Sequence, residues 1–64
     1  MKKRINEKQW DALRSNNDLR IEGFDCSVGD KVMFTYSKFE LEQMAVCSNR
    51  FDYGKGIVTV FNRI

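Results

Sequence analysis

The chain has 64 residues, of which 42% are hydrophobic and 31% charged, and its formal net charge is +2 at pH 7. This predicts a single small domain, residues 1–64, rather than a disordered chain. It contains no run of about 20 apolar residues, which excludes a membrane-spanning helix.

The first predicted element is a short helix that begins after Asn6. Asn6 is a favourable N-cap, and Gln9 stands where its side chain can bond back to the backbone of Asn6. Trp10 and Leu13 then share one face of the helix at three-residue spacing. Turn-forming polar residues follow Arg14, so the helix should end there.

Two strands are predicted next, over residues 19–24 and 31–36, because apolar and polar side chains alternate along both. The connector, residues 25–30, has the length and turn chemistry of a hairpin. If the first of these strands lies at a sheet edge, its free backbone groups would permit strand addition or a homodimer.

A second helix is predicted to begin at Ser37. Ser37 and Glu40 have the spacing of a capping box, in which each side chain bonds to the other residue's backbone. Leu41, Met44 and Ala45 follow at the spacing of an apolar helical stripe.

The last predicted strand covers residues 57–64. Its start is β-branched and apolar on both faces, which favours a central position in the sheet. Residues 51–53 form either a short strand paired with it across Gly54-Lys55-Gly56 or an ordered loop. The predicted fold is α+β in the order α-β-β-α-β, with a three- to four-stranded, mainly antiparallel sheet and two short helices.

Catalysis is not expected. The chain has no histidine, the commonest general base and metal ligand. Cys26 follows Asp25, whose charge disfavours a thiolate, and Cys47 lies near the expected end of a helix, which does the same. We therefore expect two reduced, partly buried thiols, and no enzyme activity, metal or cofactor.

Charge, aromatic surface and a tight turn coincide between Arg50 and Gly56. The glycines lack the spacing of a phosphate-binding loop and predict a turn instead. Phe51 and Tyr53 could stack on bases while basic side chains contact phosphates. The basic residues of this nucleic-acid interpretation are Lys2, Lys3, Arg4, Arg50 and Lys55.

Two segments carry a family resemblance. Val28-Gly29-Asp30-Lys31-Val32 and Gly54-Lys55-Gly56-Ile57-Val58 are similar to the V-G-D-x-V and G-x-G-x-V strands of SH3-like and Tudor-like barrels. The resemblance covers these segments alone, and it implies a nucleic-acid-binding module.

Docking on a protein is the leading interpretation. The chain has one tryptophan, two tyrosines and five phenylalanines, and interface centres favour aromatic residues, methionine and arginine. Trp10, Phe39, Tyr53 and Met33 are the expected exposed anchors. The whole predicted contact set is Arg50, Phe51, Tyr53, Lys55, Trp10 and Phe39.

We therefore expect a non-catalytic inhibitor or adaptor, of phage or mobile-element type, that docks on a larger host protein. The alternative is the nucleic-acid-binding module described above. No apolar segment follows the basic N-terminal residues, as a secretory signal would require, so a cytoplasmic location is expected.

Overall fold

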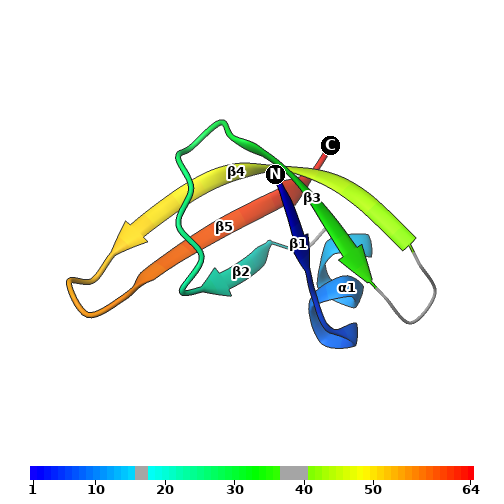
Figure 1. The fold of residues 1–64 in the computed structure, drawn as a ribbon, viewed down its shortest axis with the longest axis horizontal. Coiled ribbons are helices and arrows are strands. Elements are labelled where there is room, and N and C mark those ends of the chain that lie inside the picture. The colour runs from blue at the N-terminus through cyan, green and yellow to red at the C-terminus, as the bar shows by residue number, and fades with distance from the viewer. Residues whose placement is uncertain (16–17, 37–40) are drawn as a thin grey trace.

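The computed structural model describes residues 1–15, 18–36 and 41–64. Within these ranges the chain forms one helix and five strands (Figure 1). In chain order these are β1 (Lys2–Arg4), α1 (Glu7–Arg14), β2 (Leu19–Glu22), β3 (Lys31–Tyr36), β4 (Leu41–Asp52) and β5 (Ile57–Arg63).

The strands form a single curled sheet in the order β1-β3-β4-β5-β2. Strands β3, β4 and β5 make an antiparallel meander, and β2 joins β5 antiparallel. Strand β1 joins β3 in parallel. The Nζ atom of Lys3 lies 5.1 Å from the centre of the Phe24 ring. The curl of the sheet thus brings β1 into contact with Phe24, which follows β2, although β1 and β2 lie at opposite ends of the strand order.

The core lies between the inner face of this sheet and α1. Helix α1 contacts β2 and β5, and its Trp10 ring stacks on Tyr36 of β3 with centroids 5.8 Å apart. Phe34 and Phe61, from strands on either side of β4, meet edge to face with centroids 4.9 Å apart. Between them β4 presents the small, buried side chains of Ala45 and Cys47.

Several local expectations are confirmed. Asn6 caps α1, and the side chains of Asn6 and Gln9 bond reciprocally to each other's backbone N–H. Strand β5 lies between β4 and β2, as its apolar character predicts. Phe51 pairs with Val58, so the segment before the glycines is a strand and not a loop.

The predicted second helix is wrong. From Leu41 onwards the chain is a strand of twelve residues, paired with β3 on one side and β5 on the other. Ala45 and Cys47 are buried on its inner face, at strand spacing. Hydrogen bonding to two neighbouring strands outweighs the helix-like spacing of this segment. The capping box, residues 37–40, lies outside the described residues.

The order α-β-β-α-β and the three- to four-stranded sheet are therefore wrong as well. The described residues form β-α-β-β-β-β with five strands in a mixed sheet. Strand β1 carries only charged residues and so shows no apolar alternation. It forms through backbone bonds, including one from the Met33 amide to the Met1 carbonyl at 2.8 Å.

The expected hairpin between residues 19–24 and 31–36 is also wrong, because β2 and β3 are not neighbours in the sheet. The connector instead crosses to β4, where the Gly29 amide donates to the Cys47 carbonyl and the Cys47 amide donates to the Asp30 carbonyl, each at 2.8 Å. Phe24, the residue before the connector, is held by β5, since the Thr59 hydroxyl donates to the Phe24 carbonyl at 2.9 Å.

This core predicts a large difference between two phenylalanines of the same sheet. Phe61→Ala removes a fully buried ring and should lower the free energy of unfolding by about 3–5 kcal/mol. Phe51→Ala removes a 40% exposed ring and should change it by about 0.5 kcal/mol or less. Urea unfolding of both variants measures the difference. Equal losses would contradict this packing.

Candidate functional site: the outer face of the distal hairpin

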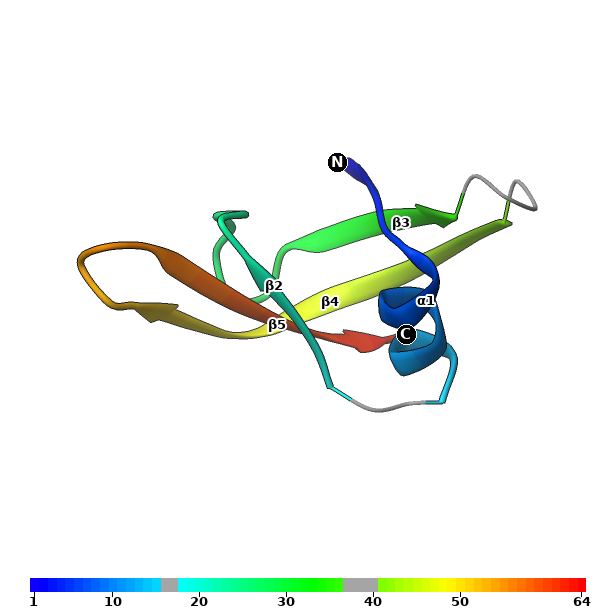
Figure 2. The same cartoon turned by 90° about the horizontal axis from the view of Figure 1, so that it is seen from below.

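The ends of β4 and β5 extend away from α1 as a hairpin, residues 50–58, which we call the distal hairpin (Figures 1 and 2). Its turn is built by local bonds. An Asp52 carboxylate oxygen accepts from the Gly54 amide at 2.9 Å, and the Tyr53 amide donates to the Gly56 carbonyl at 3.0 Å. Gly54 has a φ of 78°, a value that favours glycine.

A bulge at Ser48 sets which side chains face outward on this hairpin. The register shifts between Cys47 and Asn49, and the Ser48 hydroxyl donates to the Val60 carbonyl at 3.3 Å. Beyond the bulge, Phe51 lies opposite Val58 on the face of the sheet away from the core. Bulges commonly redirect side chains in this way.

Two aromatic rings are exposed on this hairpin. Phe51 is 40% exposed and Tyr53 is 62% exposed. Their rings stack on each other, with centroids 6.2 Å apart and an angle of 20° between the ring planes. The pair is therefore ordered before any partner arrives, and much of its apolar surface still meets water.

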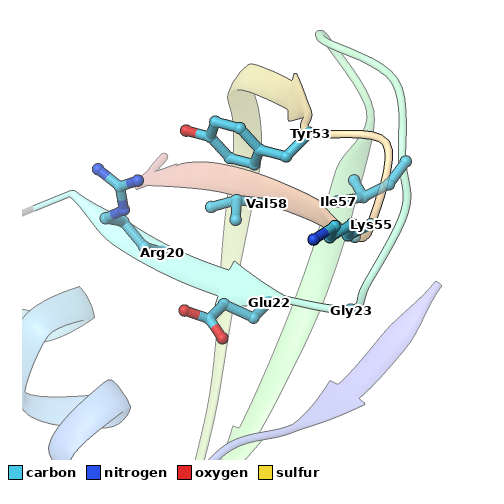
Figure 3. A pocket seen from close by; sticks show the side chains of 8 residues that line it. Arg20, Glu22, Gly23, Tyr53, Lys55, Ile57 and Val58 are labelled. Carbon is cyan, nitrogen blue, oxygen red and sulfur yellow. The ribbon is translucent and has the colours of Figure 1, made fainter.

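Beside this pair lies an open hollow of about 630 Å³ over β5 and β2. In Figure 3 its centre is Val58, with Tyr53 and Glu22 on opposite sides and Arg20 and Lys55 towards the two ends. The full lining is Arg20, Glu22, Gly23, Tyr53, Lys55, Gly56, Ile57 and Val58. An apolar floor with charged groups around it can receive an apolar side chain and orient the polar groups next to it.

Arg50 does not line this hollow, because it lies opposite Thr59, on the other face of the sheet from Val58. There it pairs with Asp25. Its Nε donates to Asp25 Oδ1 at 2.7 Å and its Nη2 to Oδ2 at 3.3 Å. This two-pronged contact lowers the pKa of Asp25 and raises that of Arg50. The pair ties the connector after β2 to β4. Sequence reasoning missed Asp25, because no local pattern links positions so far apart.

The N-terminal basic residues lie on β1, and none of them lines the hollow that Lys55 lines. The Nζ of Lys2 pairs with Glu42 at 3.6 Å, and Lys3 lies over the Phe24 ring. Arg4 belongs to the same strand. The five residues of the nucleic-acid interpretation thus divide between β1, the Asp25 ion pair and the hollow.

The remaining predicted contact residues do not join the hairpin. Trp10 is 6% exposed within the core, because its ring packs on Tyr36, so it is not the exposed anchor that we expected. Met33, on β3, is partly buried. Phe39 lies outside the described residues.

Of the predicted set, Tyr53 and Lys55 line the hollow and Phe51 stacks beside it. Sequence reasoning missed Arg20, Glu22 and Val58, which β2 and β5 bring together.

Cys26 and Cys47 are buried free thiols. Burial, together with a hydrogen bond with Cys47, raises the pKa of Cys26 to about 12. At neutral pH the Cys26 thiol is therefore protonated and a poor nucleophile. The described parts of the chain hold no group of three or more histidine, cysteine or acidic residues placed to bind a metal ion.

Comparison of the chain with protein-family models, curated proteins and solved structures found no significant match. Across the ranges that the structure describes, no helix is long and apolar enough to cross a membrane.

The ion pair predicts that Arg50→Gln raises the pKa of Asp25 towards the ordinary value of about 3.9. Because the pKa of Asp25 is lowered in the folded state, the ion pair stabilises the fold at pH values above the ordinary pKa of the carboxyl group. This stabilisation is lost as the pH falls through the lowered pKa. NMR titration of the Asp25 carboxyl carbon measures the shift. Arg20→Gln is the control and should leave that pKa unchanged. An unshifted Asp25 in the Arg50 variant would show that the pair does not form.

The buried thiols predict slow alkylation. Iodoacetamide should modify Cys26 at about pH 8 at least about 100-fold more slowly in the folded protein than in urea, where the thiol regains a pKa near 8.5. Because the folded pKa is raised, the stabilisation that it gives is complete below about pH 8.5 and declines as the pH rises towards 12. Mass spectrometry of the digested protein measures the rate at Cys26. Equal rates in the two conditions would contradict this environment.

Proposed function

We propose that the protein is a non-catalytic binding module that docks on a larger protein through the outer face of the distal hairpin. The observation that carries the proposal is the stacked pair of Phe51 and Tyr53, which is exposed and lies beside the hollow over Val58. Aromatic side chains cover a large apolar area at a low cost in side-chain entropy, and they are common among the residues that dominate binding energy.

The hollow supports a partner with an apolar side chain next to an acidic group. The apolar group would rest on Val58 against the Tyr53 ring, and the acidic group would lie near Arg20 or Lys55. Glu22, on the opposite side from Tyr53, disfavours a purely anionic ligand, because it would repel a second negative charge.

We assign this module to the class of cytoplasmic inhibitors or adaptors of phage or mobile-element type. The support for this narrower assignment is the small size and the lack of histidine.

Nucleic-acid binding is the second candidate. One observation favours it: Arg20 and Lys55 lie near the exposed Tyr53 ring on one sheet face, and bases can stack on such rings. Against it, Arg50 is engaged by Asp25, and the basic residues of β1 do not line the hollow. The protein-docking proposal therefore has more support.

The protein-docking proposal predicts a loss of affinity on removal of the Tyr53 ring. Immobilised protein should capture a partner from a nuclease-treated lysate, and Tyr53→Ala should weaken the affinity for that purified partner by at least about tenfold. Leu41→Ala, which alters an exposed apolar residue at the other end of β4, should leave the affinity unchanged. Titration calorimetry with the purified partner measures both effects.

A nucleic-acid module would behave differently in a second assay. Fluorescence anisotropy with a single-stranded oligonucleotide of mixed sequence should show no binding that falls steeply between about 50 mM and about 200 mM salt. If binding did fall steeply, and Lys55→Ala reduced that slope, the second candidate would replace the first.

A further inference from the structure

Strand β2 is an outermost strand whose backbone is paired on one side only. The Gly23 amide donates to the Ile57 carbonyl of β5 at 2.8 Å. In an antiparallel pair such bonds recur at every second residue, so Ile21, opposite Thr59, also directs its backbone groups towards β5. The N–H and C=O groups of Arg20 and Glu22 therefore point to the open edge.

The side chains of these two residues carry opposite charges and stand exposed on the outer face of β2. Among the residues that the structure describes, neither forms a hydrogen bond or an ion pair within the chain. The residues that expose backbone groups at this edge thus also carry one unneutralised positive and one unneutralised negative charge.

We propose that two copies of the chain pair antiparallel along β2, about a two-fold axis at Ile21. In this register Arg20 of one copy lies opposite Glu22 of the second copy. On the other side of the axis, Glu22 of the first copy lies opposite Arg20 of the second. Each of these pairs exchanges two backbone hydrogen bonds and places opposite charges next to each other on the same face. The inference does not depend on the proposed function.

The other free edge, β1, gives an internal comparison. There the bond from the Ile5 amide to the Thr35 carbonyl and that from the Met33 amide to the Met1 carbonyl leave Lys2 and Arg4 directing their backbone groups outward. The same two-fold pairing about Lys3 would place Lys2 opposite Arg4, and two like charges repel. The β1 edge is therefore protected against self-pairing, whereas the β2 edge is complementary to itself.

The proposed contact is short, because β2 has four residues. A stable dimer ordinarily buries a much larger surface. The association is therefore weak and concentration-dependent. In the dimer the sheet continues from one copy to the other. Because Arg20 and Glu22 line the hollow of each copy, the two hollows lie on the same outer face.

Sedimentation equilibrium over about 10 µM to about 1 mM protein tests the pairing in a range suited to weak dimers. The unmodified chain should show a reversible monomer–dimer equilibrium. Arg20→Glu and Glu22→Arg should each raise the dissociation constant by at least about tenfold, because each variant places like charges opposite one another. Lys8→Glu changes the net charge as Arg20→Glu does, on an exposed position of α1, and should leave the constant unchanged.

The decisive measurement is an equimolar mixture of Arg20→Glu and Glu22→Arg, because every cross-strand pair in a mixed dimer is then of opposite charge. The mixture should regain the dissociation constant of the unmodified chain to within about threefold. Glu22→Pro removes one outward N–H and should abolish association while circular dichroism shows an unchanged fold. A monomeric unmodified chain, or a mixture no stronger than its components, would overturn the proposal.

Discussion

The structure depends on one contact that crosses a strand. Phe34 of β3 and Phe61 of β5 touch edge to face although β4 lies between them. They can do so because the two buried side chains that β4 presents to the core, Ala45 and Cys47, are small. Two large rings meeting above small residues draw the outer parts of the sheet inward. The curl follows from this size pattern, in addition to the usual twist of strands.

The curl also decides which surfaces stay exposed. It leaves space beside β2 and β5 that α1 fills with Trp10 and Leu13. The distal hairpin extends past this helix (Figure 2). Its Phe51 and Tyr53 rings therefore cover each other in place of a core. The candidate site is the part of the sheet that the core is too small to reach.

Structural features that depend on a few neighbouring residues could be predicted from the sequence. The cap formed by Asn6 and Gln9 and the glycine turn before β5 are of this kind, since each depends on bonds over three residues or fewer. Residues 41–46 could not be read correctly, because their apolar spacing fits a helix and only pairing with β3 and β5 makes them a strand. The hollow was likewise beyond prediction: Arg20 and Val58 meet through a strand register that no short motif encodes.

The connectivity has a consequence for how the chain acquires its structure. Leu19 pairs with Phe61, so β2 has no partner until nearly all of the chain that follows it is in place. Strand β5, the only described strand that neighbours β2 in the sheet, has to be present before β2 can pair. Such distant pairings slow folding well below the rates of helical domains of similar size. While β5 is still missing, Leu19 and Ile21 remain exposed on an unpaired strand, which makes this interval the period of greatest risk for misassembly between chains.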